Sequence, residues 1–104
     1  MSRELLDQQA IKNAITILNL QSSGGWIYDD NKLCRKFMFK NFIQAMGFMM
    51  SAAIVSERMN HHPEWSNVYK TVEVALTTHS SGGVTQLDVD LAQQMEELAQ
   101  PYFA

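Results

Sequence analysis

The chain has a single cysteine, few basic residues and no long apolar run. One cysteine, Cys34, allows no intrachain disulfide and no zinc ribbon, and it fits a reducing compartment. Eight Lys and Arg against eleven Asp and Glu give a net charge of −3, which argues against direct nucleic-acid binding because that needs a concentrated basic face. The longest nearly apolar run, Ala45 to Val55, is far shorter than the roughly 20 residues of a bilayer crossing. We therefore expect neither nucleic acid nor a membrane as a partner.

The composition provides enough apolar material for one small core. The 104 residues are 46% hydrophobic, and we expect them to form one domain over residues 1–104. The charged fraction of 18% is below the average of roughly 25%, which indicates apolar surface that a partner covers. The start, MSRELLDQQA, is not a basic stretch followed by an apolar one, so we expect no signal peptide and a cytoplasmic location.

Two helices are predicted in the first sixty residues. Ser2 can cap a first helix, which ends near the paired glycines of QSSGG at residues 21–25. Asn41 can cap a long second helix that runs to about Met59. The polar positions of this helix recur every seven residues, at Gln44, Ser51 and Arg58. Such a thin polar stripe predicts a helix that is covered on more than one side, by the sheet and by a second subunit.

Strands are predicted on either side of the long helix. Residues 26–39 are typical of a β-hairpin around a turn at residues 29–32. Residues 65–79 contain a further strand in which apolar and other residues alternate. Val68 and Tyr69 could form a short strand before it.

A final helix is expected from Thr85 to Pro101, with Asp88 in the third position of its first turn. Val84 and Val89 are placed to form a hydrophobic staple across its start. The element order is α-β-β-α-β-β-α. This order predicts an α+β fold, an antiparallel four-stranded sheet with helices packed on one face.

The three histidines are the candidate functional residues. His61 and His62 lie in ERMNHHPEWSNVY, residues 57–69, and His79 is the third. Pro63 restricts His62 to extended conformations, in which neighbouring side chains point to opposite sides. The pair therefore cannot easily hold one metal, and none of the familiar ligand spacings is present. We expect no metal.

Each histidine could be an ordinary surface or capping residue. All three fall in predicted loops or at element ends, however, where scaffolds present functional groups. A free imidazole has a pKa of about 6.5, which suits proton transfer at neutral pH. Either Glu57 or Asp88 could orient such a ring. Either could instead be a solvated helix charge, and Asp88 could be an N-terminal cap. Trp65 could be a flat wall for a planar ligand or a core residue.

These residues resemble the pterin-4a-carbinolamine dehydratase family, also known as dimerization cofactors of a hepatocyte homeodomain transcription factor. The central motif is E-x-x-x-H-H-P-E-W at residues 57–65, followed by N-V-Y and by T-T-H ending at His79. Supporting matches are F-x-F-K-x-F at 37–42, A-x-G-F-M at 45–49 and D-x-x-L-A at 88–92. The likeness runs from about Trp26 to Leu98.

The resemblance implies a hydro-lyase that dehydrates 4a-hydroxytetrahydrobiopterin to quinonoid dihydrobiopterin in tetrahydrobiopterin recycling, without a cofactor. His61, His62 and His79 match the family's essential histidines. We expect His62 to bind and polarise the pterin, and the other two histidines to share the proton transfers. The residues expected to bind substrate are Glu57, Asn60, Pro63, Trp65 and Asp88.

Two positions depart from the family pattern. Asn60 stands where an aspartate is expected in animal members, which removes a charge beside the histidines. Leu87 stands where an arginine is usual, which removes a cation from the expected pocket rim. The departures bear on substrate affinity and pH optimum more than on reaction type.

The resemblance also implies a homodimer or homotetramer. In animal members it implies a transcription-factor partner bound through the same helical surface, and with it a nuclear location. The alternative function is a non-catalytic oligomerisation module. That function would depend on Phe48, Met49 or Met50 and not on the histidines.

Overall fold

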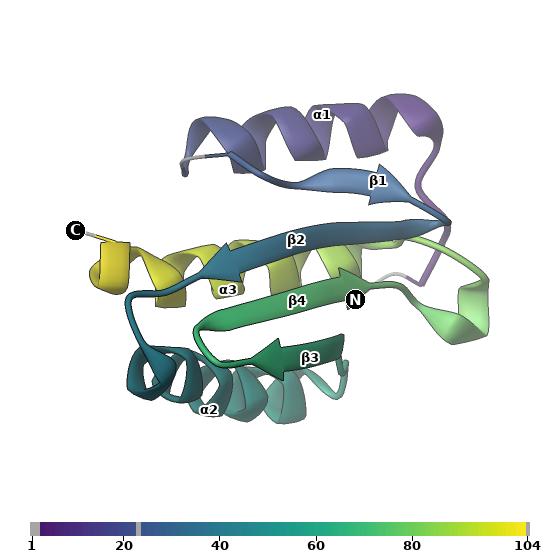
Figure 1. The fold of residues 1–104 in the computed structure, drawn as a ribbon. Coiled ribbons are helices and arrows are strands. Elements are labelled where there is room, and N and C mark those ends of the chain that lie inside the picture. The colour runs from purple at the N-terminus through teal and green to yellow at the C-terminus, as the bar shows by residue number, and fades with distance from the viewer. Residues whose placement is uncertain (1–2, 23, 104) are drawn as a thin grey trace.

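The computed structural model describes residues 3–22 and 24–103. It confirms the α+β fold: three α-helices cover one face of an antiparallel four-stranded sheet (Figure 1). The elements in chain order are α1 Gln8–Leu20, β1 Ile27–Asp29, β2 Lys32–Met38, α2 Phe42–Met59, β3 Glu64–Val68, β4 Thr71–Leu76, the short 3-10 helix η1 His79–Ser81, and α3 Gln86–Phe103. Among the described residues, no helix is both long and apolar enough to cross a membrane.

The sheet has the strand order β1-β2-β4-β3, and every neighbouring pair is antiparallel. The predicted hairpin is present as β1 and β2, with Asp30 and Asn31 at its turn in left-handed conformations. The side chains that point to the helices are Leu33, Arg35, Phe37, Val72, Val74 and Leu76, all buried. The predicted alternation of β4 therefore gives one buried face. The short strand expected at Val68 and Tyr69 is instead Glu64–Val68, because Tyr69 takes a positive φ of 54° and turns the chain into β4.

Helix α2 begins as predicted, because the Asn41 side chain accepts a hydrogen bond from the backbone N–H of Gln44 at 2.9 Å. The single chain covers this helix on one side only, and its predicted cover by a second subunit stays a prediction. Ser51 and Gln44 are only partly exposed, whereas the apolar residues Ile43, Met50 and Ile54 are 80%, 67% and 61% exposed. The helix buries a narrow face against the sheet and α3, and it leaves an apolar face open in the single chain.

Helix α3 packs against both α1 and α2 beneath the sheet. Its start matches the prediction: the Thr85 hydroxyl accepts from the backbone N–H of Leu87, and Asp88 accepts from the backbone N–H of Thr85. Its end does not, since the helix continues through Pro101 to Phe103. A proline lacks one donor, and in the last turn of a helix only one bond is lost. The Tyr102 and Phe103 rings then pack on Phe39.

Helix α1 starts later than predicted. Ser2 lies outside the described residues, and the helix begins at Gln8 with Asp7 as its cap, where Asp7 accepts from the backbone N–H of Ala10 at 2.8 Å. The segment before it is extended and is held by a hydrogen bond from Leu6 N–H to the Val84 carbonyl. This segment brings Arg3 beside η1, where the Ser81 hydroxyl donates to its carbonyl.

A buried ion pair ties the sheet to α3. Arg35 of β2 lies 2.7 Å from Glu96 of α3, and both side chains are almost fully buried. The Trp26 indole N–H donates to the same carboxylate at 2.7 Å. Burial lowers the pKa of Arg35, and the charge of Glu96 opposes that change. This cluster fixes α3 under the sheet and so fixes the start of α3, where Asp88 lies.

Candidate functional site

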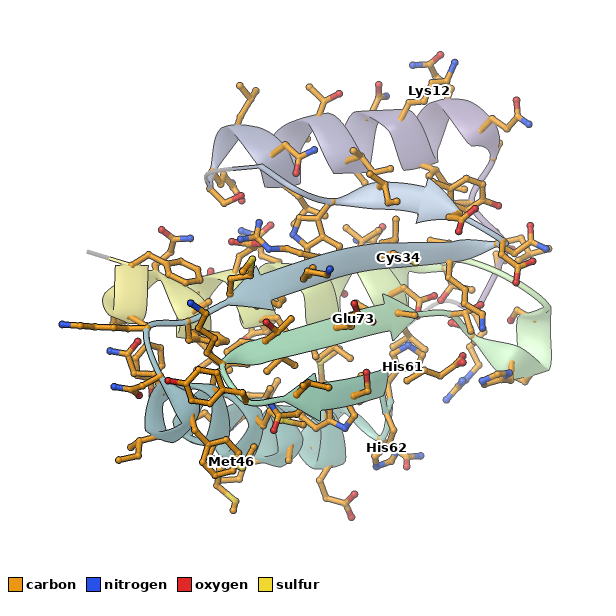
Figure 2. The ribbon with its side chains drawn as sticks, in the orientation of Figure 1. Lys12, Cys34, Met46, His61, His62 and Glu73 are labelled. Carbon is orange, nitrogen blue, oxygen red and sulfur yellow. The ribbon has the colours of Figure 1, made fainter. Side chains whose placement is uncertain are left out.

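A hollow of about 250 Å³ opens between the end of α2 and the start of η1. It is lined by Arg3, Asn60, His61, His62, Thr77, Thr78, His79 and Ser80. The fold therefore brings the three histidines together, although two strands separate His79 from the other two. Figure 2 shows His61 and His62 at the end of the sheet where β3 begins.

The end of α2 sets the directions of the two adjacent histidines. Asn60 closes the helix in a left-handed conformation, with φ 52° and ψ 42°, which asparagine tolerates better than most residues. The backbone N–H of His61 then donates to the Ser56 carbonyl at 3.0 Å. After this turn His61 points inward and is buried, whereas His62 points outward and is exposed.

His61 is built into a buried polar network. Its Nε2 lies 2.6 Å from Asp88 Oδ1, and the Asp88 side chain is fully buried. The second carboxylate oxygen, Oδ2, accepts from the Thr78 hydroxyl at 2.8 Å and from the backbone N–H of Thr85 at 2.9 Å. A carboxylate that accepts on both oxygens favours the His61 tautomer with its proton on Nε2. The network holds both the orientation and the tautomer of this ring.

Asp88 fulfils both functions that were open from sequence. One oxygen caps α3, and the other meets His61. Asp88 pairs with His61, although His79 is nearer to it in sequence. Thr78, not His79, completes the network, because the chain turns into η1 directly after it.

His62 forms a second, exposed pair. Its Nε2 lies 2.8 Å from Glu57 Oε1, and the two side chains are 58% and 81% exposed. Glu57 lies in the last turn of α2, so the turn at Asn60 folds His62 back over it. Glu57 thus orients His62 rather than His61.

His79 forms a third pair with a carboxylate that sequence reasoning missed. Its Nε2 lies 3.2 Å from Oε2 of Glu64, the first residue of β3, and Oε1 of Glu64 lies 3.0 Å from the Lys32 amine. The hydrogen bond from Lys32, assisted by the nearby His79, holds the pKa of Glu64 below its usual range. No spacing in the sequence relates these three residues, because only the strand pairing brings them together.

Some of the predicted site residues lie away from the hollow. Pro63 and Trp65 are not among the lining residues, and Trp65 is half-buried and packs against the core. Leu87 is buried with 4% exposure, so position 87 is not at a solvent-facing rim in this chain. Contact of Pro63 or Trp65 with a substrate stays a prediction.

Sequence reasoning did not identify four residues that line the hollow or the carboxylate that pairs with His79: Arg3, Thr77, Thr78 and Ser80, and Glu64. Thr78 carried a weak signal, since it precedes His79 in T-T-H. Arg3 carried none, because its place at the hollow depends on the extended segment before α1. Among residues 3–22 and 24–103, no group of three or more His, Cys, Asp or Glu side chains is arranged to hold a metal ion.

Cys34 does not line the hollow that holds the histidines. It lies in the middle of β2 on the face away from the helices, where Figure 2 also shows Glu73 of β4. Burial is the main cause that raises the pKa of the Cys34 thiol. A raised pKa favours the thiol over the reactive thiolate.

Comparison with known proteins shows the family of the chain. The pterin 4 alpha carbinolamine dehydratase family matches residues 4–98. A protein of Jannaschia sp., provisionally named a pterin-4-alpha-carbinolamine dehydratase, is 50% identical over 99 residues, which are 93% of this chain and 98% of the relative. A relative from Chelativorans sp. with the same provisional name is 48% identical over 101 residues, covering 95% and 98% of the two chains.

Two solved structures are similar. The transcriptional coactivator/pterin dehydratase from Brucella melitensis has a TM-score of 0.83 and 41% identity, over 90% of this chain and 97% of that chain. A pterin dehydratase-like RuBisCO assembly factor of the alpha-carboxysome has a TM-score of 0.61 and 20% identity, over 71% and 86%, which shows a shared fold alone. The match over nearly the whole length, together with the relatives at half identity, shows that this chain belongs to the pterin-4-alpha-carbinolamine dehydratase family.

Proposed function

We propose that this protein dehydrates 4a-hydroxytetrahydrobiopterin to quinonoid dihydrobiopterin and water. The observation that carries the proposal is the meeting of three histidines at one hollow, each with Nε2 beside a carboxylate. The family and its relatives' provisional names support the reaction class. We also propose a cytoplasmic location, which the single cysteine supports by fitting a reducing compartment.

The reaction needs two proton transfers and no electrons. An acid protonates the 4a-hydroxyl so that it leaves as water, and a base takes a proton from the neighbouring ring nitrogen. In the proposal His61 and His79 share these transfers and His62 binds and polarises the pterin. When Nε2 of a ring donates to a carboxylate, Nδ1 of the neutral ring carries the lone pair that can accept a proton.

Asn60 and Arg3 would adapt the hollow in this chain. Asn60 provides the left-handed turn without a charge. Arg3 supplies a cation at the hollow, while position 87, usually an arginine in the family, is a buried leucine here. We propose that Arg3 contributes to substrate binding from the N-terminal segment.

The test is the rate at which the absorbance of the 4a-carbinolamine is lost. We expect the wild-type protein to accelerate this loss, and His61→Ala or His79→Ala to reduce the rate at least about tenfold, since a placed acid or base contributes 10²–10⁴. Lys12→Ala, on the exposed side of α1 (Figure 2), is the matched control and should keep the wild-type rate. A wild-type rate equal to that of buffer would refute the proposal.

A separate observation favours a second candidate function, that of an oligomerisation module. Helix α2 exposes Ile43, Met50 and Ile54 along one face, which is typical of a surface covered by a partner. We propose a second copy of this chain as that partner, in a homodimer or homotetramer. The Brucella relative is described as a transcriptional coactivator as well as a dehydratase.

The residues expected for this contact need correction. Phe48 is fully buried and packs on Phe37, and Met49 is partly buried against the core, so only Met50 of the three is a surface residue. Met50→Glu with Ile54→Glu should lower the mass measured by sedimentation, whereas His61→Ala should not. An unchanged mass in the double variant would remove α2 from the interface.

A further inference from the structure

Glu64 is an acidic residue with a separate partner at each of its two oxygens. Oε1 lies 3.0 Å from the Lys32 amine, and Oε2 lies 3.2 Å from His79 Nε2. Glu64 is 41% exposed and His79 is 78% exposed. The His79 ring therefore has little packing around it, and the carboxylate is the contact that restrains its Nε2.

The strand register explains why these three residues meet. Glu64 of β3 pairs with Ala75 of β4, and Ala75 pairs on its other side with Cys34 of β2. Lys32 is two residues before Cys34, so its side chain is on the same face of the sheet. Its amine reaches across β4 to Glu64. His79 is three residues after Leu76, the end of β4, and is the first residue of η1.

The charge of Glu64 determines how it can meet the ring. The hydrogen bond from Lys32 is the first cause that lowers the pKa of Glu64, so the group is ionised around neutral pH. An ionised carboxylate has no proton to donate. A hydrogen bond between the two groups therefore needs the proton on His79 Nε2, which leaves the lone pair of the neutral ring on Nδ1.

We propose that Glu64 is a positioning residue that fixes the orientation and the Nε2–H tautomer of His79, with Lys32 bound to its other oxygen. The effect on rate rests on the proposed dehydratase function, whereas the effect on the ring does not. The other charged or titratable groups at the hollow are Arg3, His61 and His62. Arg3 is a cation on the N-terminal segment and cannot replace a carboxylate at Nε2.

The first experiment observes the ring itself. Nitrogen NMR of histidine-labelled protein distinguishes a ring protonated at Nε2 from one protonated at Nδ1. In the wild type, neutral His79 should be the Nε2–H tautomer, and in Glu64→Gln it should become a mixture, because a glutamine amide can present either its oxygen or its nitrogen. The matched control is Glu73→Gln, which removes an exposed carboxylate that lies 3.5 Å from Lys36 and does not line the hollow.

The second experiment compares kcat with KM for the same variants on the pterin carbinolamine. Glu64→Gln should lower kcat about tenfold, part of the 10²–10⁴ of a placed acid or base, with KM within about twofold of the wild type. Glu73→Gln should leave both constants unchanged. A shift of tautomer together with loss of kcat supports the proposal.

Two results overturn it: a His79 tautomer in Glu64→Gln identical to that of the wild type, or a changed tautomer in an enzyme whose kcat is unchanged. A wild-type protein that does not turn over the carbinolamine refutes the proposed function instead. In that event the NMR comparison alone decides whether Glu64 positions His79. Thermal unfolding of each variant confirms that the fold is retained, as expected for an exposed residue.

Discussion

The inner and outer parts of the histidine site use the same chemical pair in opposite surroundings. His61 is 7% exposed and meets a fully buried Asp88, whereas His79 is 78% exposed and meets a Glu64 that is 41% exposed. Asp88 also accepts two further hydrogen bonds from Thr78 and Thr85, so the inner ring is held by part of the folding core. The outer ring is held by one carboxylate at a sheet edge. We therefore expect burial to decide whether a histidine–carboxylate pair contributes to the free energy of unfolding.

The physical reason is solvent. Removing one member of a buried polar pair leaves its partner without water to replace it, and that partner's desolvation is then uncompensated. An exposed pair exchanges its contact for water at little cost. We therefore expect substitutions at the inner pair to affect folding and chemistry together, and those at the outer pair to affect chemistry alone.

The largest expected effect is that of Asp88→Ala. This change leaves the His61 ring, the Thr78 hydroxyl and the Thr85 N–H without their shared acceptor, and it removes one of the two side-chain hydrogen bonds that cap α3. The free energy of unfolding should fall by about 3 kcal/mol. Urea denaturation followed by circular dichroism measures it.

Asp90→Ala is the control on the same helix. Asp90 accepts a hydrogen bond from Gln86 on the helix surface, so its loss should change the free energy of unfolding by less than about 0.5 kcal/mol. If Asp88→Ala were as mild as Asp90→Ala, the buried network would not contribute to stability as its contacts indicate.

The next effect compares the two rings directly. His61→Ala leaves a buried carboxylate oxygen of Asp88 without a partner, and it should lower the free energy of unfolding by about 2 kcal/mol. His79→Ala removes an exposed ring and should change it by less than about 0.5 kcal/mol. Equal losses in the two variants would show that burial does not separate the inner pair from the outer one.

The frame of the fold followed from short-range patterns. Asn41 and Thr85 were predicted as helix caps and are caps, because a side chain that accepts backbone N–H groups acts within three residues. The start of α1 was not predictable, since Ser2 and Asp7 are both good caps and Leu6 fits the helical period. The hydrogen bond from Leu6 N–H to the Val84 carbonyl holds Leu6 outside the helix. Val84 is far from Leu6 in sequence, so no local pattern predicts this contact.

The same limit applies to the site. The three histidines were predicted from their types, positions and motif, and the fold places all three at one hollow. Their partners were only partly predictable. Glu57 and Asp88 were candidates, but neither pairs with the histidine nearest to it in sequence: Glu57 pairs with His62 and Asp88 pairs with His61. Glu64 needed the register of β3 on β4, and no local pattern encodes that register.

The smallest expected effect comes from Lys32→Met at the outer pair. Lys32 lowers the pKa of Glu64 below its ordinary 4.5, and Glu64 in turn raises the pKa of Lys32 above 10.5. The depressed pKa of Glu64 gives a stabilising contribution that is present above 4.5 and is lost as the pH falls through the folded value. The raised pKa of Lys32 gives one that is present below 10.5 and is lost as the pH rises through the folded value. Between these limits the wild type should have a Tm slightly above that of Lys32→Met.

This difference should shrink at low pH and in high salt, because both groups are exposed and their interaction is screened. Differential scanning calorimetry at pH 3 and pH 7, with and without added sodium chloride, measures it. Lys36→Met, which removes a looser 3.5 Å pair with Glu73, should show a smaller difference at pH 7. A gap between wild type and Lys32→Met that is as wide at pH 3 as at pH 7 would mean that Lys32 stabilises the fold through its hydrocarbon chain. Glu64 would still be ionised at neutral pH, as an exposed carboxyl is without help, and its hold on His79 would not depend on Lys32.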